Sequence, residues 1–185
     1  MRLRDLPSVD ELAGLSWRDG ATAVDVGGGN GAVLIHLLQR RADLRGIVLE
    51  LPHVAAEARA EIEKAGLAGR CDVIAGSYFE EVPAGADAYV LSHILHGWDD
   101  ERAQQILASV RKGAPDEARL LVHDAVVAPP NEPGGKMMDL LMLGISGGKE
   151  RTEEEWRALL AGGGFELGSI RALPTGASLI EAVPR

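Results

Sequence analysis

The stretch Val24-Asp25-Val26-Gly27-Gly28-Gly29-Asn30-Gly31 decides the fold, because it joins a short apolar run to an amphipathic one through a glycine loop. Glycine has no side chain and tolerates positive φ, so such a loop lets backbone come close to a ligand. A helix that follows adds exposed N–H donors and a partial positive charge at its N-terminus. The stretch therefore predicts a strand, a ligand-binding turn and a helix, in that order.

Two classes of ligand fit this loop. A dinucleotide fingerprint has the pattern G-x-G-x-x-G/A, which is met by Gly27, Gly29 and Ala32. An S-adenosylmethionine site has an acidic residue followed by G-x-G-x-G, which is met by Asp25, Gly27, Gly29 and Gly31. Glu50 ends the next apolar run, and a carboxylate there can bind both ribose hydroxyls in either class. The loop alone leaves both ligands open.

Outward from the loop, apolar runs alternate with amphipathic stretches. Strands are expected at residues 21–26, 46–51, 71–75, 86–92, 119–127, 165–172 and 177–182. Helices are expected at residues 31–41, 53–65, 99–112, 136–143 and 152–161. This alternation predicts an α/β fold with a mostly parallel seven-stranded sheet, helices on both faces and an antiparallel strand at the C-terminal end.

Composition narrows the class of protein. The 185 residues are 46% hydrophobic and carry a formal net charge of −9, which argues against binding of nucleic acid phosphates. Cys71 is the single cysteine, so no internal disulfide forms, and the histidines show no paired spacing for zinc. No apolar run reaches the roughly 20 residues that cross a bilayer. We expect a cytoplasmic protein with no membrane, nucleic-acid or metal partner.

The segment Leu91-Ser92-His93-Ile94-Leu95-His96-Gly97-Trp98-Asp99-Asp100 distinguishes the cofactors. It leaves the fourth expected strand at the carboxyl edge of the sheet, where ligands bind in folds of this class. Two histidines, a tryptophan and two acids within ten residues favour chemistry over packing.

The chain here resembles the plant-type and bacterial small-molecule O-methyltransferases, which act on phenols, flavonoids, hydroxyindoles and polyketides. The matching motifs stand in family order at residues 24–31 (VDVGGGNG), 49–54 (LELPHV), 76–79 (GSYF), 95–100 (LHGWDD) and 147–152 (GGKERT). The resemblance implies a Rossmann-like class I methyltransferase fold, S-adenosylmethionine as cofactor and S-adenosylhomocysteine as product.

The resemblance also implies roles for single residues. Those expected at the cofactor are Asp25, Gly27, Gly29, Gly31, Glu50, Leu51, Ser77, Tyr78, Ser92 and Trp98. His96 matches the general base, and Asp124 and Glu150 match the acids that flank and orient it. The acceptor pocket is expected to be lined by Met138, Leu141, Met142 and Ile145.

Four positions depart from the family pattern. Family members often have Asp where this chain has Glu50, Ser77 and Gly97, and the loss of a carboxylate at Ser77 is expected to weaken adenine binding. Asp124 replaces the commoner Glu and is one methylene shorter, which leaves its reach to His96 open.

The family usually carries an N-terminal helical, winged-helix-like part, which forms the dimer and closes over the acceptor. We expect residues 1–20 to be the connecting helix of that part and residues 21–185 to be the methyltransferase domain. The longer form is expected to be a homodimer, and this chain to turn over an aromatic or polyketide-like acceptor poorly alone. The alternatives are the same scaffold used for hydroxylation, decarboxylation or C-methylation, and a fragment that only binds cofactor.

Overall fold

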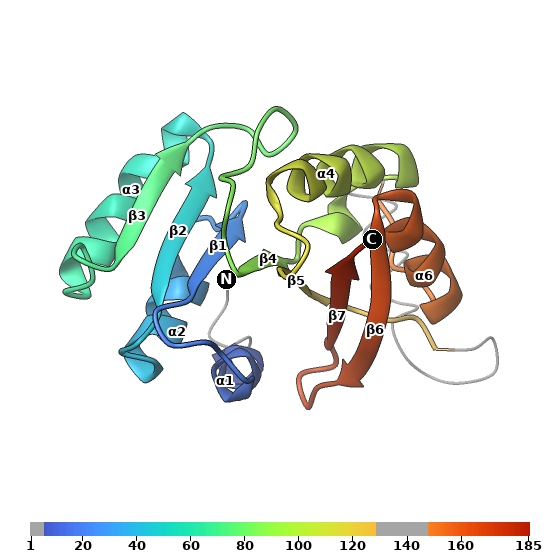
Figure 1. Ribbon diagram of the computed structural model, residues 1–185, viewed down its shortest axis with the longest axis horizontal. Coiled ribbons are helices and arrows are strands. Elements are labelled where there is room, and N and C mark those ends of the chain that lie inside the picture. Colours follow the sequence, from blue (N-terminus) through green and yellow to red (C-terminus); the bar gives the residue numbers. More distant parts are fainter. Residues whose placement is uncertain (1–5, 129–147) are drawn as a thin grey trace.

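The computed structural model describes residues 6–128 and 148–185, and it shows an open sheet with helices on both faces (Figure 1). The strands are β1 (Thr22–Val26), β2 (Arg45–Glu50), β3 (Cys71–Ala75), β4 (Ala88–Ser92), β5 (Arg119–Asp124), β6 (Phe165–Ala172) and β7 (Ser178–Pro184). The helices are α1 (Leu6–Gly14), α2 (Ala32–Arg40), α3 (Pro52–Lys64), α4 (Asp100–Gly113) and α6 (Glu153–Gly162), with a short 3-10 helix, η2 (Leu95–Gly97).

The seven strands lie in the order β3-β2-β1-β4-β5-β7-β6. The pairs β1–β2, β1–β4, β2–β3 and β4–β5 are parallel, and β7 pairs antiparallel with both β5 and β6. The predicted mostly parallel sheet with one antiparallel strand near the C-terminus is therefore confirmed. This topology places the carboxyl ends of β1 to β5 at one edge.

Two apolar layers cover the sheet. The first is built around α1, α2 and α3, and in α2 the predicted face of Val33, Leu34, Leu37 and Leu38 is buried. The second is built around α4 and α6, whose Trp156 is fully buried and donates its indole N–H to the Ala125 carbonyl. No helix within the described residues is long and apolar enough to cross a membrane.

The helix starts follow from local hydrogen bonding. Asp99 caps α4 by accepting the backbone N–H of Arg102 at 2.8 Å. Thr152 and Glu155 form a reciprocal capping box that begins α6. These caps fix where α4 begins after the segment that carries His96, and where α6 begins after the segment that carries Glu150.

The predicted bounds were wrong by two or more residues at three strands. The strand expected at 177–182 runs from Ser178 to Pro184. The strand expected at 86–92 begins at Ala88, and the carboxylate of Asp87 before it accepts the backbone N–H of Thr22. The strand expected at 119–127 ends at Asp124, the last residue of β5 that pairs with β7. Beyond it, Val126 and Val127 pair with Arg151 instead. The helix expected at 136–143 lies outside the described residues.

Candidate active site

The glycine loop has the left-handed backbone that its sequence predicts. Gly27, Gly29 and Gly31 have φ values of 73°, 57° and 80°, in the region that side chains strongly disfavour. These three glycines are those of the G-x-G-x-G pattern of an S-adenosylmethionine site. Gly31 is also the N-cap of α2, so the loop leads directly into a helix N-terminus.

Two glycines of the loop are needed for close packing. A Cβ atom on Gly27 would lie 2.7 Å from the Ile94 side chain and 3.1 Å from the Tyr78 ring. A Cβ atom on Gly28 would lie 2.6 Å from the Asp25 carboxylate. The loop is therefore enclosed between residues of β1 and residues that follow β3 and β4.

Asp25 lies beneath this loop as a buried carboxyl. Its exposed fraction is 1%, and its Oδ2 accepts no hydrogen bond from any group in the described part of the chain. Burial, and secondarily the negative charge of Glu50, raises the pKa of Asp25 to about 7. A buried oxygen without a hydrogen-bond partner lowers the stability of the folded chain.

Glu50 ends β2 and reaches across to the loop. Its Oε2 accepts the backbone N–H of Gly29 at 2.9 Å, and its Oε1 accepts that of Leu51 at 2.7 Å. Carboxylate oxygens can accept further bonds, so both remain able to bind ligand hydroxyls. Leu51 follows with 40% of its surface exposed, as an apolar group at the rim of the same edge.

Aromatic side chains gather where β3 and β4 end. The ring centroids of Tyr78 and Phe79 lie 5.0 Å apart, and Phe79 meets Trp98 edge to face at 5.0 Å. The Arg102 guanidinium lies over the rings of Phe79 and Trp98 at 5.4 and 5.8 Å. A hollow of about 400 Å³ opens at the end of β3, and its lining includes Leu49, Ile74, Ser77 and Glu80.

His96 sits on η2 between two buried carboxylates. Its Nδ1 lies 2.9 Å from Glu150 Oε1, with which it shares a hydrogen bond, and 3.1 Å from Asp124 Oδ1. The backbone N–H of His96 also donates to Asp124 Oδ2 at 3.3 Å. Asp124, although one methylene shorter than the commoner residue, therefore reaches both the ring and the backbone of His96.

Opposing effects set the pKa of His96. Burial alone would lower this pKa, but the hydrogen bond that Glu150 accepts from the ring and the charges of Asp124 and Glu150 outweigh burial and raise it. The nearby Arg151 guanidinium opposes those charges. The imidazole is thus held with its Nδ1 against the carboxylates, which leaves Nε2 as its other polar atom.

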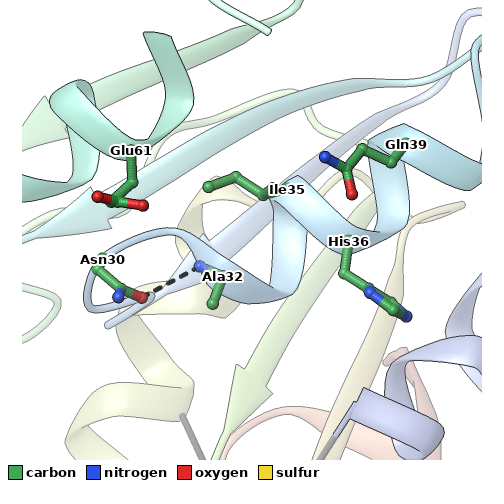
Figure 2. A pocket seen from close by; sticks show the side chains of 6 residues that line it. All are labelled: Asn30, Ala32, Ile35, His36, Gln39 and Glu61. Atoms are coloured by element: carbon green, nitrogen blue, oxygen red, sulfur yellow. Dashed lines mark hydrogen bonds between the residues drawn. The ribbon is translucent and has the colours of Figure 1, made fainter. Parts of the chain in front are cut away.

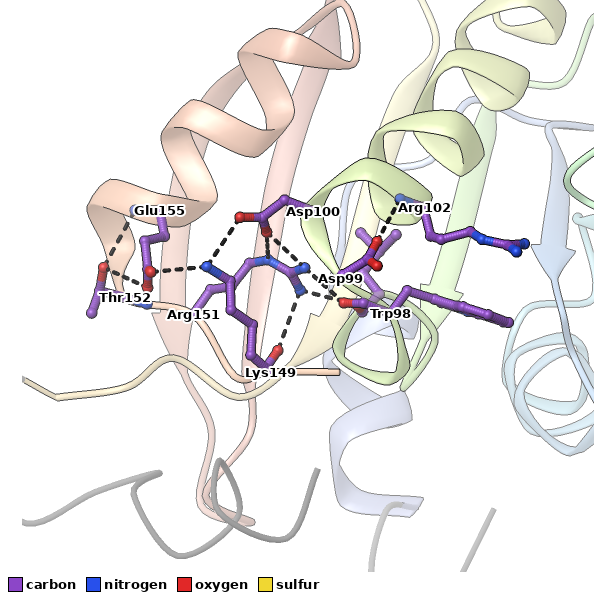
Figure 3. Close-up of polar contacts among 9 residues, drawn as sticks. Trp98, Asp99, Asp100, Arg102, Lys149, Arg151, Thr152 and Glu155 are labelled. Carbon is purple, nitrogen blue, oxygen red and sulfur yellow. Dashed lines mark hydrogen bonds and ion pairs between the residues drawn. The ribbon is translucent and has the colours of Figure 1, made fainter. Parts of the chain in front are cut away.

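Arg151 ties together the segments that carry His96 and Glu150, and motif reading did not single it out. Figure 3 shows this fully buried guanidinium against Lys149, Trp98 and Asp100. It donates to the carbonyl oxygens of Leu95 and Trp98 at 3.0 and 2.9 Å. It also forms an ion pair with Asp100 at 2.9 Å. The family resemblance implied a role for its neighbour Glu150 but none for Arg151, although both belong to the motif at residues 147–152.

The other residues predicted for the site lie either at the same edge of the sheet or outside the described residues. Ser92 ends β4, and its Oγ lies 3.1 Å from His123 Nδ1. Ser77 accepts the backbone N–H of Phe79 at 3.3 Å. The expected acceptor-pocket residues Met138, Leu141, Met142 and Ile145 all lie outside the described residues.

A second hollow begins beside the glycine loop. Figure 2 shows it beside the first turns of α2, with a volume of about 240 Å³. Its lining residues are Asn30, Ala32, Ile35, His36, Gln39 and Glu61. Asn30 and Ala32 belong to the glycine loop and the start of α2, but none of the lining residues is among those expected to contact the cofactor.

Comparison with known proteins identifies the family. A model of the O-methyltransferase domain matches residues 9–166. The chain belongs to this O-methyltransferase family. The glycine loop, Glu50, His96, Asp124 and Glu150 all lie within the matched residues.

Named relatives include two bacterial O-methyltransferases. The phenazine O-methyltransferase PhzM of Lysobacter antibioticus is 40% identical over 164 residues, which are 88% of this chain and 48% of that protein. The mitomycin biosynthesis 6-O-methyltransferase of Streptomyces lavendulae is 40% identical over 171 residues, 92% of this chain and 48% of that protein. The chain thus spans about half the length of these curated relatives.

A solved relative has ligands bound. It is the O-methyltransferase NcsB1 from neocarzinostatin biosynthesis, in complex with S-adenosylmethionine and 2-hydroxy-5-methyl naphthoic acid. Its TM-score is 0.87 at 37% identity, and the match covers 95% of this chain and 53% of that one. The agreement confirms the class I methyltransferase fold predicted from the sequence.

Proposed function

We propose that this chain is the S-adenosylmethionine-binding catalytic domain of a small-molecule O-methyltransferase, in which His96 is the general base. The observation that carries the proposal is the imidazole of His96, held at the sheet edge by two buried carboxylates. Membership of the O-methyltransferase family supports it, as does the glycine loop at the same edge.

The residues of this edge fit the cofactor. Gly27, Gly29 and Gly31 have positive φ and provide a backbone cradle without side chains, and the α2 N-terminus supplies N–H donors for a carboxylate. Glu50 would bind the ribose hydroxyls, and Leu51 would pack on the adenine. Ser77, Tyr78 and Trp98 would wall the adenine pocket, and Ser92 would lie near the amino-acid end. Asp25, being buried, would support the loop from below.

Bound at this edge, S-adenosylmethionine supplies a methyl group on a sulfonium, which is a good leaving group. The chain itself must then align the acceptor oxygen and remove its proton. His96 Nε2 takes that proton while Nδ1–H stays hydrogen-bonded to Glu150. Asp124 and Glu150 fix the tautomer and stabilise the imidazolium that forms.

We propose an aromatic or polyketide-like hydroxyl compound as acceptor, bound beside Met138, Leu141, Met142 and Ile145. Methionine and leucine adapt to irregular apolar ligands. The relatives support this class of acceptor, since one is named a phenazine O-methyltransferase and another a mitomycin biosynthesis 6-O-methyltransferase. We further propose that α1 belongs to the connection to an N-terminal dimerisation part, and that the longer form is a homodimer.

Calorimetry and mass spectrometry test the proposal separately. We expect the chain to bind S-adenosylmethionine but not NAD, and tight NAD binding alone would refute the cofactor assignment. In a library of hydroxylated aromatic acceptors, the product should be heavier by one methyl group. His96→Ala should lower the rate about a hundredfold or more. The matched control His53→Ala changes an exposed histidine at the start of α3 and should retain activity. Equal rates for wild type and His96→Ala would remove His96 from the mechanism.

A further inference from the structure

We propose that His93, His96 and Asp124 form an inhibitory site for a divalent transition-metal ion, with Zn²⁺ as the preferred occupant. One ligand atom from each of the three residues lies within 4.8 Å of the other two. Two imidazoles and a carboxylate are a ligand set that zinc favours, with a further position left for water. From the sequence we expected no metal, and the proximity of Asp124 to the two histidines appears only in the folded chain.

The backbone brings the two histidines together. His93 has a φ of 57°, a left-handed conformation that no other non-glycine residue in the described part of the chain adopts. The turn follows β4 directly, beside the end of β5 that carries Asp124. The rings of His93 and His96 consequently lie with centroids 5.4 Å apart. Strain at a single non-glycine residue is typical of functional positions.

The distances suit a small tetrahedral ion. Asp124 Oδ1 lies 3.1 Å from His96 Nδ1 and 3.7 Å from His93 Nδ1. Two ligands that each bind zinc at about 2.0–2.1 Å in a tetrahedral site are separated by about 3.4 Å. The observed separations lie on either side of that value, so small side-chain rotations would complete the site.

The local charge also favours a cation. Asp124 and Glu150 are both fully buried as side chains, and Asp124 Oδ1 accepts no hydrogen bond from any described group. A bound metal ion would offset the free-energy cost of burying this carboxylate oxygen without a hydrogen bond. His93 keeps 35% of its side chain exposed, which gives an ion a route from solvent.

Inhibition follows if His96 is the base, so this part of the inference rests on the proposed function. A metal on Nδ1 leaves the neutral ring protonated at Nε2, which then cannot accept a proton from the acceptor hydroxyl. A metal on Nε2 occupies the same atom directly. In both arrangements the ion prevents His96 from accepting the proton of the acceptor hydroxyl.

Titration of the tag-free chain with zinc chloride alone tests the site. Calorimetry should show one equivalent bound, unaffected by millimolar Mg²⁺, which prefers oxygen ligands. His93→Asn should raise the Kd for zinc more than about tenfold, and asparagine tolerates the left-handed φ. The control His53→Asn should leave the Kd unchanged. Absence of zinc binding, or equal binding by His93→Asn, would overturn the proposal.

Two further measurements test the zinc site. Co²⁺ added to the wild-type chain should give the visible absorption bands of a tetrahedral ion, and zinc should remove them; no such bands would contradict the site. In the acceptor assay, zinc should inhibit and a chelator should restore the rate, with His93→Asn resistant relative to its own metal-free rate. Binding at this site without inhibition would contradict His96 as base, whereas an active enzyme that binds no zinc would contradict the metal site alone.

Discussion

Replacing Asp25 by asparagine should change how stability depends on pH. The pKa of Asp25 in the folded chain is about 7, against 3.8 for an ordinary aspartate, chiefly because the carboxyl is buried. The folded state therefore holds this proton more tightly than the unfolded state does. Stability from this group is greatest below pH 3.8 and is lost as the pH rises through 7. A shift of about three units corresponds to roughly 4 kcal/mol.

Most of that loss, roughly 3 kcal/mol, falls between pH 5 and pH 8. Urea unfolding followed by tryptophan fluorescence at each pH measures it directly. The free energy of unfolding of Asp25→Asn, relative to wild type, should improve by that amount across the range. Asp72→Asn removes an exposed carboxylate of β3 and controls for the loss of one charge. Parallel curves for wild type and Asp25→Asn would refute the reasoning.

Further variants test the segments around His96. In Gly148→Ala the new Cβ would overlap the carbonyl oxygen of His96, so we expect a loss of about 2 kcal/mol in urea unfolding and a lower kcat. In the control Gly69→Ala the new Cβ meets nothing within 4 Å, and stability and kcat should be unchanged. Arg151→Met removes the guanidinium donors to the carbonyl oxygens of Leu95 and Trp98 and should cost about 3 kcal/mol in the same assay; a cost no larger than that of Asp100→Asn would contradict the role of the carbonyl contacts. Glu150→Gln should lower kcat tenfold or more while calorimetry shows an unchanged Kd for S-adenosylmethionine, and a weakened Kd with normal kcat would contradict its placement.

Much of the fold was predictable because its signals are local. The glycines at 27, 29 and 31 adopt positive φ, as a chain passing from strand to helix requires. The apolar face of α2 and the capping box at Thr152 are set by residues within one turn of each other. Strand ends were less predictable, because β5 stops where its pairing with β7 stops, and β7 lies more than fifty residues further along the chain.

The site was predictable in its members but not in its contacts. Motif resemblance pointed to His96, Asp124 and Glu150, and the structure brings all three together. The resemblance did not assign a role to Arg151, because the backbone carbonyls that it binds have no sequence signature. Nor did it place His93 against Asp124, since that contact depends on one unusual φ value.

The position of β7 between β5 and β6 has a consequence for biosynthesis. Strand β7 is synthesised after β5 and completes the sheet beside Asp124, through the pair of Asp124 with Ser178. Until β7 is in place, β5 is an open edge strand with unpaired backbone groups. Nascent chains should therefore stay vulnerable to proteases and to aggregation until β7 emerges from the ribosome, and loss of β7 should prevent maturation more severely than loss of α1.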